Sequence, residues 1–396
     1  MAGPHSSRTP LHAQIHAYLL ELLQAREWPA YEPLPTESEL AAQFHVSRFT
    51  AKKALNDLAD KGLIYRVQGK GSFIARAESD PAKHPARKPE GIGTSKIVAL
   101  IMPRLQEGLS ANLLAGAEQH LSANGYHTLF RSSCNRQWLE QQILRDCAEA
   151  GVRGIIIFPV DGESYNEEIL RLTLNRYPIV VVDRYLKGVD THCVSSDNEG
   201  GAYEATSHLL GLGHRRIVYF GVDSVIATSL ADRLAGYEKA LAERQIPLDY
   251  HRCVCEVKAE HLNAGRDHDH HSAAFRSVFR GFLENNPDTT AVFAANAYLG
   301  MAVMEVALEL DIRVPEQLSV IFFDDYMNSS LSAIPPSCIV QPELQIGAEA
   351  ARMLLSIIEN PGQERRKRTL PTRLVVRSST AVVRQAISQS PALSFE

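Results

Sequence analysis

The sequence has no apolar run close to the roughly 20 residues that a membrane-spanning helix needs, and its first residues, MAGPHSSRTPLHAQ, contain no apolar signal core. We therefore expect a cytoplasmic protein with no membrane partner. The six cysteines form no CxxC pair, which favours reduced, mostly buried thiols. A length of 396 residues suits two or three domains, and a hydrophobic content of 45% allows a buried core.

Motifs of catalysis are also missing. There is no GxxxxGK[ST] loop for a nucleoside triphosphate, no GxSxG elbow, and no order of Asp and His that suggests a triad. Two clusters contain residue types that bind metals, RDHDHHSAAF (266–275) and the pair Cys253 and Cys255. We interpret the first as a solvated loop in an irregular region and the second as core residues of a strand. The sequence predicts no enzyme, no cofactor and no metal site.

Charge is distributed unevenly along the chain. The whole protein has a formal net charge of -5, yet residues 47–76 contain seven Lys or Arg against two Asp. A basic patch on an acidic protein indicates one face that meets nucleic acid.

Residues 1–76 have the pattern of three helices followed by a hairpin. Apolar residues recur at helical spacing in LHAQIHAYLLELLQA (11–25), and the prolines of WPAYEPLP end that helix. Thr36 and Glu39 have the spacing of a capping box, which predicts a second helix. Ser47 caps a third helix that ends near Lys61. LIYRV and SFIA, joined by QGKG, are typical of a hairpin, and the whole order predicts a winged helix-turn-helix.

The third helix of such a domain enters the major groove of DNA with its N-terminal residues. Ser47 and Thr50 can bond phosphates or base edges, and Arg48 can contact guanine through two hydrogen bonds. Lys52 neutralises phosphate, and Gly69 lets the hairpin approach the neighbouring groove. The alternative, a solvated basic helix on a scaffold domain, fits the helix alone but not the ordered series LPTESELA…VSRFTAKKALNDLADKGLIYRVQGKGSF.

That series resembles the GntR family of bacterial regulators over residues 11–76. The resemblance implies DNA reading by Ser47, Arg48, Thr50, Lys52 and the wing glycine. Two departures affect the expected operator: many members have Arg at the position of Ser38, and a polar residue is more usual at that of Phe49. The predicted DNA-binding residues are Glu37, Ser38, Ser47, Arg48, Phe49, Thr50, Lys52, Gln68, Gly69 and Lys70.

Residues 77–95 are rich in Pro, Gly and charge and predict a linker. The remaining residues, 96–396, alternate between apolar strand-like runs such as KIVALIM, GIIIFPV, PIVVVD and RIVYFG and segments of helical length. Strands that are apolar throughout indicate parallel sheets covered by helices on both faces. We expect a ligand-binding and dimerisation domain here.

Polar residues follow several of these strands, where ligands of open parallel sheets bind. Asp183 and Arg184 follow PIVVVD, Asn296 ends AVFAAN, and Asp324 follows LSVIFF, while Arg233 begins a later helix. Carboxylates, an amide and guanidinium groups suit a polyhydroxylated ligand. Taken singly, each of these residues could instead form a surface salt bridge or cap a helix.

Residues 96–384 resemble the LacI/GalR effector domain, which shares its two-lobed α/β fold with periplasmic sugar-binding proteins (type I). The stretches VVVDRY, DRLAGYEKAL and DIRVPEQLSVIFFDDY carry the resemblance. It implies that Asp183, Arg184, Arg233, Asn296 and Asp324 hold a sugar. Ala297 and Phe322 depart from the family pattern and would reshape the pocket. A GntR head on such a body is the architecture of the AraR-type arabinose repressors.

The combination predicts a dimeric repressor of carbohydrate genes that releases double-stranded operator DNA when a sugar binds. A dimer is implied because one winged helix reads one half-site, and we expect the helix near 109–123 to contribute to its interface. The alternatives are an activator or a corepressor-dependent repressor on the same fold, an enzyme fused to a DNA-binding head, and a sugar-transport protein.

Overall fold

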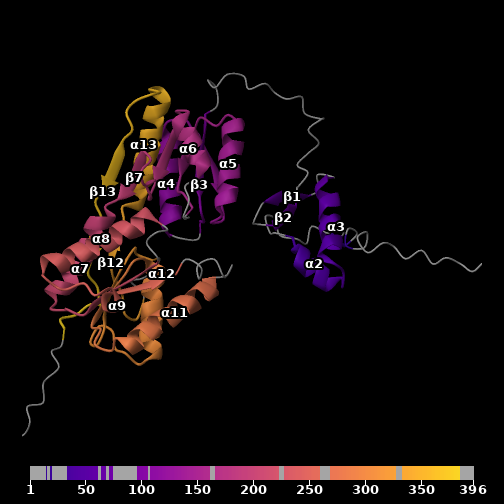
Figure 1. Cartoon of the computed structure of the whole chain (residues 1–396). Coiled ribbons are helices and arrows are strands. Elements are labelled where there is room, and N and C mark those ends of the chain that lie inside the picture. Colours follow the sequence, from indigo (N-terminus) through magenta and orange to yellow (C-terminus); the bar gives the residue numbers. More distant parts are fainter. Residues whose placement is uncertain are drawn as a thin grey trace, which may run out of the picture. The chain divides into compact units, whose positions relative to one another are not determined.

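The computed structural model describes residues 15, 18, 19, 34–60, 64–67, 71–74, 96–105, 108–160, 166–222, 227–258, 268–326 and 332–383. The chain divides into two compact units, Met1–Pro89 and Glu90–Glu396; here they are called the head and the body, and each is described by itself (Figure 1). The division falls inside the predicted linker, which lies outside the described residues. The bounds 1–76, 77–95 and 96–396 therefore stay a prediction.

The head contains the predicted helix-turn-helix. Helix α2 (Glu37–Gln43) is capped by Thr36, whose hydroxyl accepts from the amide of Glu39 while the Glu39 carboxylate accepts from the amide of Thr36. Helix α3 (Arg48–Asp60) follows after a turn. The predicted helix 11–25 lies mostly outside the described residues, but Ile15 and Leu19 are helical and fully buried. They pack with the predicted inward residues of α3, namely Ala51, Ala54, Leu55 and Leu58.

The head also contains the predicted hairpin. Strand β1 (Ile64–Val67) pairs antiparallel with β2 (Gly71–Ile74). The connecting residues Gln68, Gly69 and Lys70 lie outside the described residues, so their contact with DNA stays a prediction.

The first lobe of the body is a parallel six-stranded sheet in the order β13-β7-β6-β5-β3-β4. Its strands are β3 (Ile97–Met102), β4 (His127–Ser132), β5 (Gly154–Ile157), β6 (Ile179–Val182), β7 (Cys193–Ser196) and β13 (Lys367–Leu370). Successive side chains of β3 enter different cores, because strand residues alternate between faces. One core includes α4 (Gly108–Ala123) and α13 (Glu343–Glu359), and the other includes α5 (Gln137–Glu149) and α6 (Glu167–Leu174).

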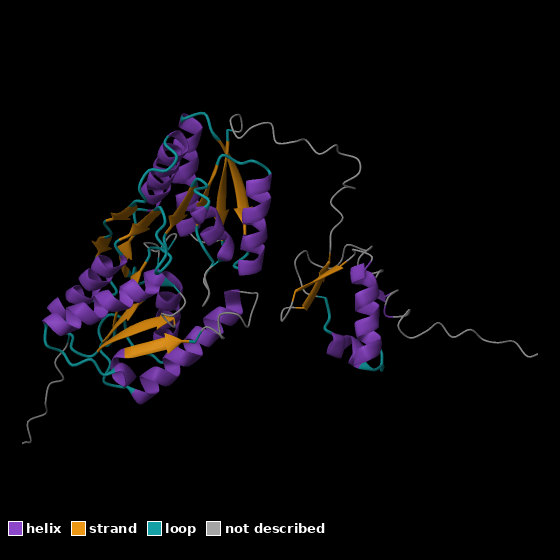
Figure 2. Ribbon diagram, turned by 45° about the horizontal axis from the view of Figure 1, so that its top comes forward, coloured by secondary structure: helices purple, strands orange, loops and turns teal. Residues whose placement is uncertain are grey.

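The second lobe is a six-stranded sheet in the order β14-β12-β11-β10-β8-β9. Its strands are β8 (Ile217–Val222), β9 (Val254–Val257), β10 (Ala291–Ala294), β11 (Ser319–Phe323), β12 (Ser337–Val340) and β14 (Arg373–Val375), and β14 alone runs antiparallel, to β12. Its helices are α7 (Asn198–Gly211), α8 (Thr228–Glu243), α9 (Tyr250–Cys253), α11 (His268–Asn285) and α12 (Ala297–Glu309). Helices flank the strands in both lobes (Figure 2).

In its described part, the body crosses between the two lobes three times. The crossings follow β7 at Ser196, β12 at Val340 and β13 at Leu370, and each leads into an element of the other lobe. A backbone hydrogen bond from the amide of Asp197 to the carbonyl of Leu370 joins the first crossing to the third. The predicted two-lobed α/β fold is therefore confirmed.

Two local expectations are wrong. The segment 266–275 is not a loop throughout, because α11 begins at His268 and continues to Asn285. Cys253 does not alternate with Cys255 along one strand, since Cys253 ends α9 and only Cys255 lies in β9. Within the described residues, no set of His, Cys, Asp or Glu side chains could hold a metal ion, and no helix has the length and apolarity to cross a membrane.

Candidate DNA-binding and ligand-binding sites

The start of α3 presents two hydroxyl groups that are bonded to each other. The Ser47 hydroxyl accepts from the amide of Thr50 at 3.2 Å, and the two side-chain oxygens lie 2.9 Å apart. Ser47 therefore caps α3, as predicted. The positive end of the helix dipole, together with these hydroxyls, forms a surface suited to a phosphate group.

Arg48 is exposed, and a residue of the other helix orients it. Its Nε donates to the Ser38 hydroxyl at 2.9 Å, and its Nη2 also donates to that oxygen. Ser38 thus has a role that its sequence position did not reveal, because it fixes the direction of the guanidinium group. These bonds involve Nε and Nη2, so other N–H groups of the guanidinium can still donate to a base edge.

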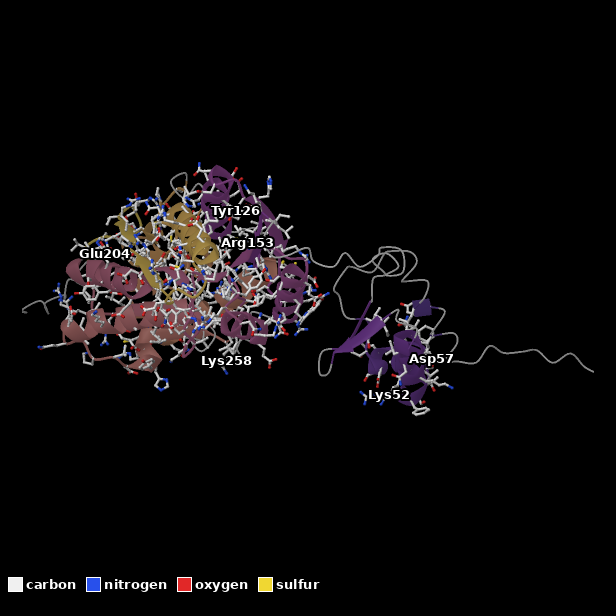
Figure 3. All side chains as sticks on the ribbon, turned by 90° about the horizontal axis from the view of Figure 1, so that it is seen from above. Lys52, Asp57, Tyr126, Arg153, Glu204 and Lys258 are labelled. Atoms are coloured by element: carbon white, nitrogen blue, oxygen red, sulfur yellow. The ribbon has the colours of Figure 1, made fainter. Side chains whose placement is uncertain are left out.

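Phe49 and Lys52 lie on the outer face of α3. The Phe49 side chain is 77% exposed, so it does not pack within the described part of the head. Lys52 projects away from the ribbon (Figure 3) and is exposed, as is Lys53, whereas Glu37 at the start of α2 is half-buried. This outer face contains the predicted DNA-binding residues Arg48, Phe49 and Lys52, and their contact with DNA stays a prediction.

We expect Lys52→Ala to weaken binding to every DNA sequence alike, because a lysine that meets phosphate carries no base information. The dependence of log affinity on log salt concentration should become shallower by about one unit. Fluorescence anisotropy with specific and random duplexes over a salt series measures both effects. Lys258→Ala, which changes an exposed lysine of the body, is the control; a salt slope that is the same in both variants would contradict the assignment.

In the first lobe, Asp183 and Arg184 lie at the carboxyl end of β6. Asp183 is buried and has a positive φ of 68°, a conformation that Asp tolerates better than most residues. The Arg184 guanidinium stacks on Phe158 at 4.8 Å from the ring centroid, and its Nη1 donates to the Pro159 carbonyl at 3.0 Å. Its Nε lies 3.4 Å from the Asp183 carboxylate. Arg184 is thus fixed across the ends of β5 and β6.

The second lobe has the same combination at the end of β11. Asp324 has a φ of 72°, and its carboxylate lies 3.6 Å from Nη1 of Arg233. Arg233 is only 4% exposed, and its guanidinium stacks on Phe323 at 3.7 Å. It also donates to Asn198 Oδ1 at 2.9 Å and to the Ala295 carbonyl at 2.7 Å. Each lobe therefore presents an aspartate beside an arginine that stacks on phenylalanine.

Asn296 is a helix cap, which was the structural alternative to a ligand contact. Its Oδ1 accepts from the amide of Leu299 at 2.9 Å and caps α12. The cap uses Oδ1, so a ligand contact through the amide nitrogen of Asn296 is compatible with it.

Three residues that the sequence analysis did not select connect the site to the crossings. Gln341 donates through Nε2 to Asp324 Oδ1 at 2.5 Å and accepts through Oε1 from the Ser196 hydroxyl at 2.5 Å. Asn198 bonds Arg233 and also donates to the Ser196 carbonyl at 3.3 Å. All three are buried. Ser196 ends β7, Asn198 lies two residues later, and Gln341 follows β12, so the position at a strand end was the signal that could have identified them.

A cavity of about 540 Å³ lies beside this network. The first turn of α4, the residues after β11 and the second crossing line it, including Asn112, Asp325, Gln341 and Glu343. The pocket is open to solvent; its size suits a small ligand, and its lining side chains include hydrogen-bonding groups of Asn112, Gln341 and Glu343. Residues 106–107, 161–165, 223–226 and 327–331 follow neighbouring strands but lie outside the described residues.

Tyr185 joins the two lobes directly. Its hydroxyl donates to Asp232 of α8 at 3.0 Å, and its backbone amide donates to the Thr228 hydroxyl at 3.1 Å, which in turn donates to the Tyr185 carbonyl at 3.0 Å. Burial, followed by the nearby Asp232 carboxylate, raises the pKa of Tyr185 to about 12, and burial raises the pKa of Asp232. These bonds stabilise the arrangement of the two lobes in this structure.

Tyr185→Phe should raise the ligand concentration for half-maximal binding by about fivefold. The change removes one hydrogen bond that exists only while the lobes are together, and such a bond contributes about 1 kcal/mol. Calorimetric titration of the body's ligand measures the shift, with melting temperature as the check on folding. An unchanged binding constant would show that the bond is not part of the closed, ligand-binding state.

The comparisons with known proteins match both units. Residues 11–74 match the model of bacterial regulatory proteins, gntR family, and residues 206–380 match the periplasmic binding protein-like domain. An arabinose metabolism transcriptional repressor of Halalkalibacterium halodurans is 31% identical over 87% of this chain and 90% of that protein. Another from Geobacillus stearothermophilus is 30% identical over 88% and 92%.

Solved structures extend the likeness of the body. A LacI family transcriptional regulator from Enterococcus faecium with bound ribose superposes with a TM-score of 0.61, at 24% identity over 73% of this chain and 100% of that one. At this identity the match shows the fold alone. Both family models match, and the two repressors align along most of their length. This chain therefore belongs to the family of bacterial transcriptional repressors that join a GntR winged helix to a periplasmic-binding-protein-like body.

Proposed function

We propose that this protein represses carbohydrate genes and releases its operator when a sugar binds between the lobes of the body. The observation that carries the proposal is the paired arrangement at the facing strand ends, Asp183 with Arg184 and Asp324 with Arg233. Aspartates accept from paired hydroxyl groups, and arginines donate to hydroxyl and ring oxygens. The relatives named as arabinose repressors, and the related structure with bound ribose, support a sugar as ligand.

The mechanism is linkage between two sites on one chain. A sugar that contacts both lobes stabilises the closed body, because its bonds to the second lobe exist only after closure. The closed and open bodies then hold the two heads of a dimer differently, and the fit to two half-sites changes. A coupling free energy of about 1–3 kcal/mol gives 5–150-fold control.

The proposed repressor is a dimer, and α4 contributes to the proposed dimer interface. One side of α4 is covered by α13, where Gly116 faces the backbone of Leu344 and Gly347 faces that of Leu113 with no room for a side chain. The residues of α4 that stay exposed in the body are Ala111, Asn112, Ala115, Glu118, Gln119, Ser122 and Ala123. The proposal includes no catalytic step and no cofactor, and it places the protein in the cytoplasm with its DNA.

A band-shift titration tests this function. A tight-binding duplex is first selected from a random DNA pool with the full-length protein. The complex is then titrated with L-arabinose, D-ribose, D-xylose and D-galactose in turn. We expect at least one sugar to release the duplex. A sugar that tightens binding would indicate corepression, and no response to any of a broad panel of sugars would overturn the proposal.

A further inference from the structure

The exposed face of α3 is basic, with one apolar side chain. Its exposed residues, within the described part of the helix, are Arg48, Phe49, Lys52, Lys53 and Asn56. The opposite face packs into the core of the head, and Phe49 is 77% exposed. A single exposed apolar residue is common on protein surfaces and needs no explanation by itself. The position of Phe49 among these cations is the informative observation.

The polar residues at the start of α3 already have hydrogen-bond partners. The Ser47 and Thr50 hydroxyls lie 2.9 Å apart, and Arg48 Nε donates to the Ser38 hydroxyl at 2.9 Å. Phe49 is on the same side of α3 as Lys52, because residues three and four positions apart share one side of a helix. An apolar side chain therefore stands at the N-terminal end of the side of α3 that carries exposed lysines.

The chemistry of the major groove limits what such a side chain can contact. A recognition helix enters the groove with its N-terminal residues leading. Guanine, adenine and cytosine present hydrogen-bonding groups there, and thymine alone adds an apolar group, the 5-methyl. A phenylalanine ring placed over a polar base edge would displace water without replacing its hydrogen bonds, which costs free energy. Contact with a thymine methyl removes apolar surface of both partners from water.

We propose that Phe49 is a specificity-determining residue that contacts the 5-methyl group of a thymine in each operator half-site. The preference has two parts, a favourable apolar contact with thymine and a desolvation penalty against the polar edges of the other bases. The thymine lies within about two base pairs of the guanine that Arg48 contacts, because adjacent Cα atoms are about 3.8 Å apart and stacked bases about 3.4 Å. This inference rests on the proposed function, because it concerns the operator that the repressor binds.

A structural role for Phe49 has a different signature. Thymine and uracil pair with adenine in the same way and differ only in the 5-methyl group. A phenylalanine that packs elsewhere in the head, or that only excludes water from the interface, would not distinguish the two bases. The ratio between the affinities for a thymine duplex and its uracil counterpart therefore isolates the proposed contact.

The test uses the full-length protein without sugar and the duplex selected from the random pool. Each thymine is replaced in turn by deoxyuridine, and fluorescence anisotropy gives the dissociation constants. We expect at least one replacement to weaken wild-type binding by about fourfold, the effect of losing one buried methyl group. Phe49→Ala should bind the thymine and uracil duplexes with the same, reduced affinity, whereas Phe49→Leu should keep part of the preference.

Lys53→Ala is the matched control on the same side of α3. It should weaken the thymine and uracil duplexes by one common factor, because a lysine that meets phosphate carries no base information. A second measurement adds the methyl group back. Replacing the sensitive T·A pair by C·G should weaken wild-type binding, and 5-methylcytosine in place of that cytosine should recover about fourfold. Phe49→Ala should show no such recovery.

The possible failures are distinguishable. If no duplex is selected, or if no sugar releases the selected duplex, the proposed function fails; in the second case the thymine test still applies, because it needs only specific binding. If no thymine of the duplex is sensitive in the wild type, or if Phe49→Ala keeps the full sensitivity, the inference alone is overturned. Loss of the sensitivity in Lys53→Ala would also overturn it, because the preference would then not depend on the ring.

Discussion

Arg233→Ala is expected to abolish the sugar response while operator binding without sugar stays near that of the wild type. The guanidinium group is buried on Phe323 and bonds Asn198 and the Ala295 carbonyl beside Asp324. Its loss removes a charged donor from the site and leaves the Asp324 carboxylate without its cation. Truncating one partner of such a buried pair costs about 2–5 kcal/mol, which corresponds to a loss of roughly 30- to several thousand-fold in sugar affinity.

Band shifts over a sugar titration measure this effect, and thermal unfolding checks the fold. Arg244→Ala, at the exposed end of the same helix α8, is the matched control and should respond like wild type. Asp324→Asn provides a second variant with little change in volume, in case Arg233→Ala does not fold. If either site variant still released DNA at the wild-type sugar concentration, that residue would not contribute to ligand binding.

Arg48→Ala should weaken specific operator binding by about 1–3 kcal/mol, the contribution of one good base contact. Binding to random DNA should fall much less, because phosphate contacts supply most of that affinity. Ser38 holds Arg48 in a fixed direction, so Ser38→Ala should produce a smaller loss in the same sense. Anisotropy titrations with the selected duplex and a random duplex measure both. If Arg48→Ala changed neither affinity, α3 would not be the recognition helix.

Local signals in the sequence predicted the head well. The capping box of Thr36 and Glu39, the cap at Ser47 and the hairpin pairing are all decided by residues close together in the chain. The orientation of Arg48 by Ser38 was not predictable in this way, because it depends on how two helices cross.

In the body, the rule that ligands bind beyond strand ends selected Asp183, Arg184, Arg233 and Asp324, and the structure places their guanidinium and carboxylate groups in two pairs. The rule missed Gln341 because β12, SCIV, begins with a serine and a cysteine and has only two aliphatic residues, so it is not an apolar run like IVVV of β6. The sequence around a strand also does not show which of the two sheets the strand joins. Only the fold shows that Gln341 follows a strand of one lobe, bonds Asp324 and begins a crossing to the other lobe.

The central claim is that sugar and operator influence each other's binding through closure of the body. Because the two affinities are linked, the claim can be tested by measuring the affinity for sugar. Calorimetry would give the dissociation constant of the releasing sugar for the free protein and for the protein saturated with operator. Coupling is reciprocal, so operator should weaken sugar binding by the same factor, about 5- to 150-fold, by which sugar weakens operator binding. Equal sugar affinity in the two states would contradict the account.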